Sequence, residues 1–172
     1  FTVLFKAATS NIDSSVVQAS VNSINQISDG YTDNILAIIA GKNIKDMYAA
    51  FSFAMKKDSL LPADKAHIAD ASFTAGTEMR TAGGDSQNET LAALILESMN
   101  QLTALKWSQS SPAVVKYFYQ VQGDYKNDKA GIDVLIPVVR CMGAMGTTDS
   151  AQALSIFLGL LNSETEQKKT YN

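Results

Sequence analysis

Apolar residues recur every three to four positions through almost the whole chain, and no segment sustains the alternation of period two that a half-buried strand needs. A repeat of this length places the apolar side chains of each segment on one face of an α-helix. It predicts an all-α fold: an antiparallel bundle of about seven to eight helices, joined by connections of about two to eight residues. We find no repeat of fixed period, which argues against a regular solenoid.

The length of 172 residues suits a single domain, since one hydrophobic core typically serves about 100–200 residues. We expect one helical domain over residues 1–162, followed by a polar C-terminal tail over 163–172. Gly83 and Gly84 lie just before a helix-capping sequence, so a boundary between two packed sub-bundles near 83–87 stays open as an alternative.

Capping residues and helix breakers indicate where several helices begin. We expect Ser10 to begin the first long helix, Ser86 to cap the fifth through a capping box with Glu89, and Asp149 to cap the last. Pro62 predicts another start, because proline is preorganised for the first turn. The side chains expected to face the core from the first and last of these helices are Ile12, Val16, Val17, Val21, Ile24 and Ile27, and Ala153, Leu154, Phe157, Leu158 and Leu161.

The charge pattern argues against a nucleic-acid partner and against a transmembrane helix. The chain has 14 Lys and Arg against 17 Asp and Glu and lacks long basic runs, whereas a nucleic-acid surface needs clustered basic residues to displace counterions. Asp133 and Arg140 interrupt the apolar run over 132–145, so no apolar segment of about 18 residues is available to span a bilayer.

Two observations on the cellular compartment point in opposite directions. The lone Cys141 cannot close a disulfide within the chain, which favours the cytosol. The charged fraction of only 18%, the abundance of Ser, Thr and Asn, and the sequon Asn88-Glu89-Thr90 favour a secreted or otherwise extracytosolic protein, which we expect. Cys141 is interpreted as a buried structural thiol, and an exposed thiol that pairs with another chain is the alternative.

His67 is the only histidine, and histidine is the side chain that most readily changes charge near neutral pH. Asp64 and Asp70 lie three residues to either side on the expected helix, where a carboxylate can orient the ring. We interpret the trio as a partly exposed histidine beside acids, with pH sensing as the first functional alternative. No catalytic G-x-S-x-G motif and no Cys and His set for zinc is present, so we expect neither catalytic residues nor a metal site.

The densest aromatic cluster lies between residues 107 and 125. Tyr117, Phe118 and Tyr119 are consecutive, and successive helical residues are about 100° apart, so at least one of the three should reach a second surface. That surface is either a pocket or an interface. The residues expected to line such a pocket are Trp107, Tyr117, Phe118 and Met145.

Scarce reactive side chains and surplus aromatic and Met residues favour binding over catalysis. We expect a non-catalytic helical protein that either holds an apolar or pigment-like small molecule between its helices or associates with copies of itself. A structural subunit of a larger complex or filament is the alternative, for which an apolar helix over 132–142 would be useful. An enzyme that uses His67 with a neighbouring carboxylate is the second alternative. The identity of any cofactor or ligand is left open.

Overall fold

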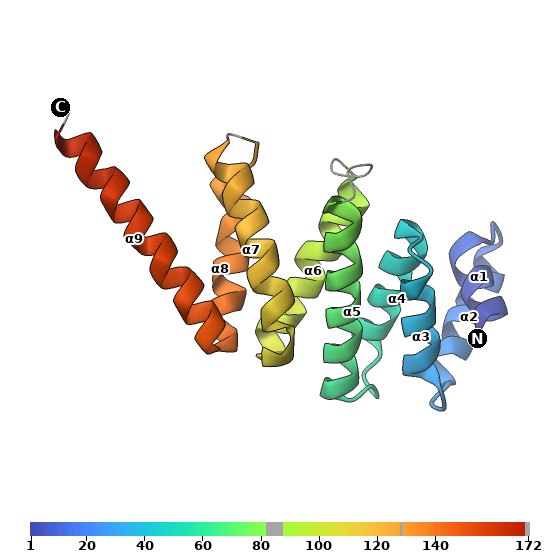
Figure 1. Ribbon diagram of the computed structural model, residues 1–172. Helices are drawn as coiled ribbons and strands as arrows, with labels where there is room; N and C mark the ends of the chain where they lie inside the picture. Colours follow the sequence, from blue (N-terminus) through green and yellow to red (C-terminus); the bar gives the residue numbers. More distant parts are fainter. Residues whose placement is uncertain (82–87, 128, 171–172) are drawn as a thin grey trace. The chain divides into compact units, whose positions relative to one another are not determined.

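The computed structural model describes residues 1–81, 88–127 and 129–170, with side chains up to residue 163 (Figure 1). Within these residues it contains nine α-helices, one 3₁₀ helix and no strand, which confirms the predicted all-α class. The elements are α1 (Thr2–Ser10), α2 (Ser14–Gln26), α3 (Tyr31–Ala40), α4 (Ile44–Lys56), α5 (Pro62–Thr81), α6 (Glu89–Leu105), η1 (Ser108–Ser110), α7 (Ser111–Lys126), α8 (Ile132–Met145) and α9 (Thr148–Thr170).

The chain divides into two compact units, Phe1–Gln101 and Leu102–Asn172. In the first unit α1 packs on α2, α3 packs on α4 and α5, and α4 packs on α5. In the second unit α7 packs on α8 and α9, and α8 packs on α9. Helices α3 to α5 run alternately up and down, as do α7 to α9 (Figure 1). The sub-bundle boundary expected near 83–87 lies outside the described residues. The division between the two units falls after Gln101, within the sequence of α6.

The N-terminal region differs from the expected single helix that starts at Ser10. Residues 2–10 form a helix of their own, and Asp13 caps α2 by accepting hydrogen bonds from the Ser15 backbone at 2.8 Å and the Ser15 hydroxyl at 2.7 Å. Ile12, which was expected to face the core, lies in the connection and is fully exposed, and Val16 is also exposed. The prediction was wrong because the apolar periodicity continues past Asp13, whereas the Asp13 side chain binds the backbone and starts a new helix there.

Helices α3, α4 and α5 supply much of the core of the first unit. Asn43 caps α4 by accepting a hydrogen bond from the Asp46 N–H at 3.2 Å, and Pro62 is the first residue of α5. Small residues face inward from α5, and a Cβ added to Gly76 would lie 2.9 Å from Ile95 Cγ1 on α6. The buried side chains of α3 to α5 include Tyr31, Ile35, Ile39, Met47, Phe51, Ala54, Ala66, Ile68, Ala69 and Phe73.

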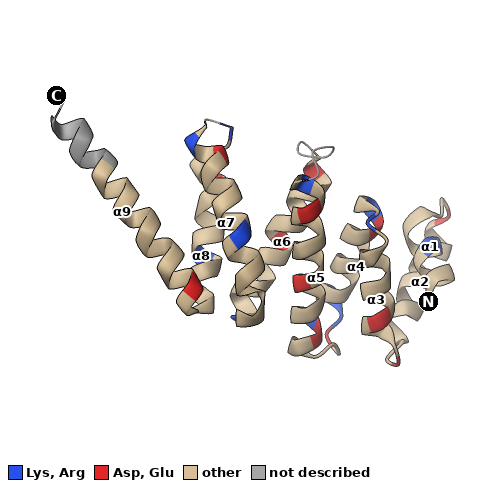
Figure 2. Cartoon of the chain, in the orientation of Figure 1, with Lys and Arg blue, Asp and Glu red and all other residues tan. Residues whose placement is uncertain are grey.

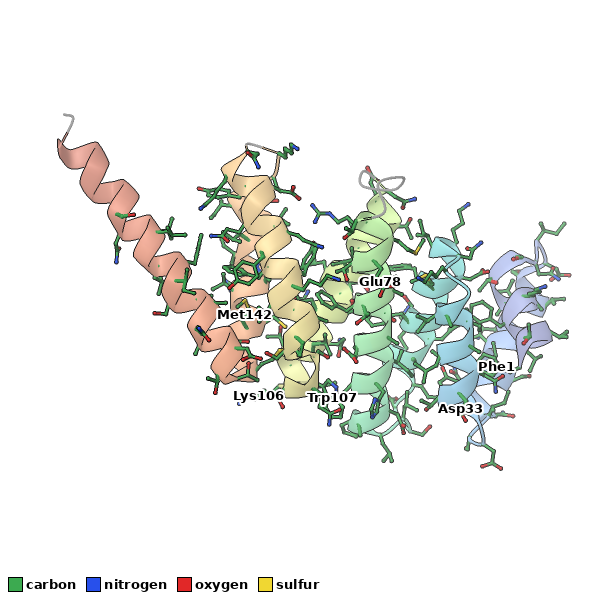
Figure 3. The ribbon with its side chains drawn as sticks, in the orientation of Figure 1. Phe1, Asp33, Glu78, Lys106, Trp107 and Met142 are labelled. Carbon is green, nitrogen blue, oxygen red and sulfur yellow. The ribbon has the colours of Figure 1, made fainter. Side chains whose placement is uncertain are left out.

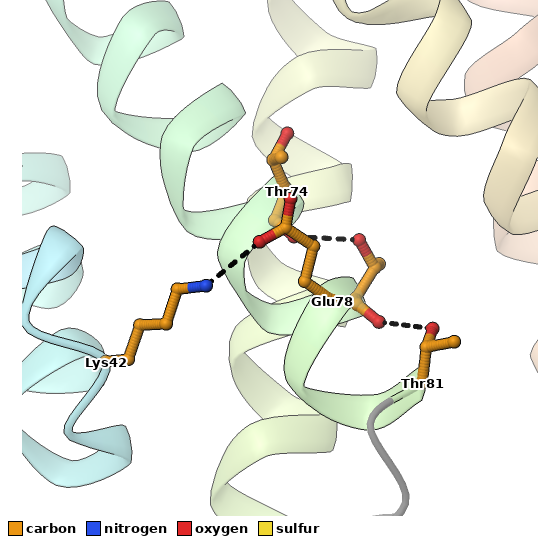
Figure 4. Close-up of polar contacts among 5 residues, drawn as sticks. Lys42, Thr74, Glu78 and Thr81 are labelled. Atoms are coloured by element: carbon orange, nitrogen blue, oxygen red, sulfur yellow. Dashed lines mark hydrogen bonds and ion pairs between the residues drawn. The ribbon is translucent and has the colours of Figure 1, made fainter.

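An exposed ion pair joins the end of α3 to α5 in this unit. Lys42 follows the Gly41 C-cap with a φ of +54°, and its Nζ lies 3.1 Å from Glu78 Oε2 (Figure 4). Near Glu78 on α5, the Thr77 hydroxyl donates a hydrogen bond to the Thr74 carbonyl, and the Thr81 hydroxyl donates one to the Thr77 carbonyl (Figure 4). Both charged side chains are half exposed, so this pair contributes little to stability.

Helix α6 begins and ends with recognisable caps. Asn88, not Ser86, caps its start, since Asn88 Oδ1 accepts a hydrogen bond from the Leu91 N–H at 3.1 Å; Ser86 lies outside the described residues. At its end Lys106 has a φ of +50° and donates its N–H to the Thr103 carbonyl, and the Trp107 N–H reaches the Leu102 carbonyl at 3.1 Å. These two bonds form a Schellman motif, so Trp107 closes the helix end.

In the second unit a cluster of hydroxyls joins the starts of α7 and α9. Thr147 Oγ1 accepts a hydrogen bond from the Ser150 N–H at 3.2 Å, so Thr147 caps α9 and Asp149, the expected cap, lies in the first turn. Ser111, the first residue of α7, has its hydroxyl 2.6 Å from that of Thr147 and 3.1 Å from that of Ser150. The Thr147 side chain is thus held by two partners, which explains why it caps the helix in place of the aspartate.

Candidate functional site

Helix α9 carries large aliphatic side chains around most of its circumference. Ala153 and Phe157 are buried, on the side of α9 that packs on α7 and α8. Residues on both flanks of this buried strip are exposed, and at about 100° per residue the apolar positions span about 200°. The exposed side chains, which we call the α9 apolar band, are Ile156, Leu158, Leu160 and Leu161.

The α9 apolar band corrects the prediction that Leu158 and Leu161 face the core. Leu158 is 57% exposed, and even Leu161, the least exposed member, is 36% exposed. The prediction was wrong because α7 and α8 cover only the middle of an apolar surface that is broader than one helix contact. Half-buried Leu154 continues the flank of Leu158 and Leu161, since these three positions follow the spacing i, i+4, i+7.

The α9 apolar band lies in a region without charge. Residues 150–163 include no Asp, Glu, Lys or Arg, and Asp149 is the single charged residue among the α9 side chains that the structure describes (Figure 2). Helix α8 adds exposed Ile132 and Ile136, which are four residues apart and so lie on one face. Isolated exposed aliphatic residues are ordinary, but the α9 apolar band places four of them within six positions of one uncharged stretch of the helix.

The four residues predicted to hold a ligand all lie in the second unit. Tyr117 and Phe118 belong to α7, Met145 ends α8, and half-buried Trp107 follows α6 (Figure 3). Phe118 is 0% exposed, and its ring meets the Phe157 ring edge-on with 5.4 Å between the centroids. Tyr117 and Met145 are also buried. Packing within the core therefore accounts for the burial of Phe118. A ligand that contacts this face of the Phe118 ring would have to displace Phe157.

One of the three consecutive aromatic residues is exposed, and its place in a pocket or an interface stays a prediction. Tyr119 is 48% exposed, while Tyr117 and Phe118 are buried. The Tyr119 ring remains beside Phe118, with 5.6 Å between the centroids. This arrangement follows from the helical spacing, which turns Tyr119 about 100° away from Phe118.

His67 lies on the exposed side of α5, and Asp64 and Asp70 are half-buried one turn to either side. The structure therefore brings the predicted pH-sensitive trio together on one helix. An exposed position agrees with the interpretation of a solvated histidine beside acids. The pH-sensing and catalytic alternatives remain predictions.

Cys141 is buried on α8 and forms no disulfide, in agreement with the expected structural thiol. Burial raises the pKa of the Cys141 thiol, and a hydrogen bond with the Thr103 side chain opposes this rise. A thiol that is both buried and neutral is a poor nucleophile and a poor site for pairing with another chain. The alternative of an exposed, intermolecular thiol is therefore wrong for this conformation.

A hollow of about 310 Å³ opens between α4 and α6 in the first unit. Phe51, which is almost fully buried, and Met55 supply apolar lining. Helix α4 adds Ser52 and Lys56, and the α6 side consists of Glu97, Asn100 and Gln101. We call it the α4–α6 hollow.

The Glu97 carboxylate in the α4–α6 hollow is held by a neighbour on α4. The Tyr48 hydroxyl donates a hydrogen bond to Glu97 Oε1 at 2.7 Å. This hydrogen bond, and the negative charge of Glu97, raise the pKa of Tyr48, because ionisation would remove the donated proton and place two negative charges together. The sequence alone does not indicate this site, because its residues come from helices separated by about forty positions, although the spacing of Glu97, Asn100 and Gln101 already places those three on one face.

The described residues contain no group of three or more His, Cys, Asp or Glu side chains that could hold a metal ion. Over the same residues, no helix combines the length and the apolar character that crossing a bilayer requires. Comparison with protein-family models, with curated proteins and with solved structures finds no match. The α9 apolar band and the α4–α6 hollow are the candidate sites among the described residues.

Proposed function

We propose that this protein is a non-catalytic assembly protein whose copies associate through helix α9. The observation that carries this proposal is the α9 apolar band, in which four aliphatic side chains remain exposed beyond the strip covered by α7 and α8. Burial of apolar area is the main driving force of protein association, at about 25 cal/mol per Å². The proposed association would remove this area from water.

A second copy of the chain is the partner that the charge pattern favours. Residues 150–163 are uncharged, so two α9 helices can approach without like charges facing each other. Outside this stretch the sequence carries Asp149 before it and both acidic and basic residues after it, Glu164, Glu166, Lys168 and Lys169. Two copies joined through the same face of α9 would form a pair in which each copy presents the same residues to the other. Such a pair has the two-fold symmetry that is commonest among oligomers.

Sedimentation velocity over a range of protein concentrations tests this proposal. We expect the mean mass of the wild-type chain to rise with concentration, and the double variant Leu158→Gln, Leu161→Gln to remain a monomer because it places polar side chains on the flank. The matched control is Ser155→Gln, Asn162→Gln, which introduces the same residue at exposed polar positions of the same helix and should associate as the wild type does. A wild-type chain that stays monomeric at every concentration, or a leucine double variant that associates equally well, would show that α9 does not join copies.

A further inference from the structure

The α4–α6 hollow combines an apolar lining with two opposite charges that do not pair with each other. Lys56 comes from α4 and Glu97 from α6, and both side chains are exposed. Among the described residues the ion pairs do not include one between Lys56 and Glu97. The two charges therefore do not neutralise each other, and Phe51 and Met55 line the same hollow.

The remaining polar groups strengthen this pattern. Asn100 and Gln101 offer amide donors and acceptors, and the Ser52 hydroxyl can both donate and accept. The hydrogen bond from Tyr48 orients Glu97, which reduces the conformational entropy that this side chain would lose when a ligand binds. A volume of about 310 Å³ lies at the lower end of the range for small-molecule sites, about 300–1,000 Å³, so a ligand must be small.

We propose that the α4–α6 hollow binds a free α-amino acid with an apolar side chain. Its carboxylate would pair with Lys56, its ammonium with Glu97, and its side chain would cover Phe51 and Met55. A simple anion such as a phosphate fits less well, because Glu97 would repel it, and a simple cation is repelled by Lys56 in the same way. A zwitterion with an apolar group matches both charges and the lining. This site is independent of the proposed association, since it lies in the first unit and the α9 apolar band lies in the second.

Titration of the full chain with L-leucine, followed by backbone amide NMR, tests the proposal. We expect shifts confined to residues 51–56 and 97–101, which include the α4 and α6 positions that line the hollow. N-acetyl-L-leucine lacks the ammonium and L-leucinamide lacks the carboxylate, so each should bind about tenfold more weakly than leucine. Glycine lacks the apolar side chain and should also bind more weakly.

Two charge-removing variants identify which group of the ligand each residue holds. Glu97→Gln should weaken leucine about tenfold and leave N-acetyl-L-leucine unweakened, because that analogue has no ammonium to lose. Lys56→Gln should weaken leucine similarly and leave L-leucinamide unweakened. Lys45→Gln, at an exposed lysine of α4 outside the hollow, is the control and should bind leucine as the wild type does.

All three substituted residues are exposed, so the variants should fold, and the dispersion of the amide spectrum checks this. The proposal is overturned if leucine causes no shifts, or if the shifts map outside the hollow. It is equally overturned if leucine and its two blocked analogues bind alike, or if the three variants weaken leucine to the same degree. None of these outcomes bears on the association through α9.

Discussion

The burial of Tyr31 makes the stability of the first unit depend on pH. Its side chain is almost fully buried, and its hydroxyl has no hydrogen-bond partner among the described residues. Lys57, itself buried, places its Nζ 4.9 Å from the centre of the Tyr31 ring and donates a hydrogen bond to the Asn25 carbonyl. Burial raises the pKa of Tyr31 from 10.0 to about 12, because the phenolate would lose its hydration.

The raised pKa predicts a loss of stability at high pH with a definite sign. The unfolded chain releases the Tyr31 proton near pH 10 while the folded chain retains it until about 12, so the free energy of unfolding falls as the pH rises between these values. Tyr31→Phe should remove this contribution and stabilise the protein by about 1 kcal/mol at neutral pH, since it deletes a buried hydroxyl that has no partner. Urea unfolding at a series of pH values measures both effects. Equal pH dependence in the variant and the wild type would contradict this account of Tyr31.

At the scale of single helices, the sequence predicted the elements whose capping residues lie beside their apolar stripes. Pro62 begins α5 as expected, because this signal acts within one turn of the helix that it starts. Thr147 caps α9 in place of the expected Asp149, because the partner that holds Thr147 is Ser111, thirty-six positions away. Long-range partners of this kind leave no local pattern.

The candidate sites were predictable to a smaller extent than the helices. The sequence identified α9 as amphipathic but not which of its apolar positions stay exposed, because that depends on how much of the helix α7 and α8 cover. The sequence predicts Tyr117 and Phe118 as lining of a ligand pocket but does not show that Phe118 packs against Phe157 of α9. Composition shows that such side chains are in surplus, while only packing shows whether another side chain already fills the space.

The C-terminal end of α6 allows a prediction about one helix cap. Lys106 has a φ of +50°, a left-handed conformation that costs an L-residue about 1–2 kcal/mol and costs glycine almost nothing. Lys106→Gly should raise the free energy of unfolding by about 0.5–1 kcal/mol, after allowance for the greater entropy of glycine in the unfolded chain. Lys106→Ala is the matched control, because it removes the same side chain but keeps the backbone cost, and it should not stabilise. Chemical denaturation of both variants decides the matter, and equal stability of the two would contradict the cost assigned to this turn.

At the scale of the whole molecule, the division at residue 101 has consequences for how the chain unfolds. Phe73 lies in the core of the first unit, and Phe118 lies in the core of the second, each 0% exposed. Truncation of either ring to alanine removes about 3–5 kcal/mol of packing. If each unit unfolds cooperatively by itself, the truncation lowers the stability of only the unit that contained the ring.

Hydrogen exchange measured by mass spectrometry distinguishes two cooperative units from one. We expect Phe118→Ala to speed exchange in α7 and α8 and leave α3 to α5 protected as in the wild type, and Phe73→Ala to give the reverse pattern. Each variant is the control for the other, because the same atoms are removed from an equally buried position. Acceleration of both units in both variants would mean that the chain unfolds as one domain, because α6, whose residues belong to both units, would then couple their stabilities. The expected result instead makes each unit able to hold its own site, the α4–α6 hollow in the first and the α9 apolar band in the second, while the other is open.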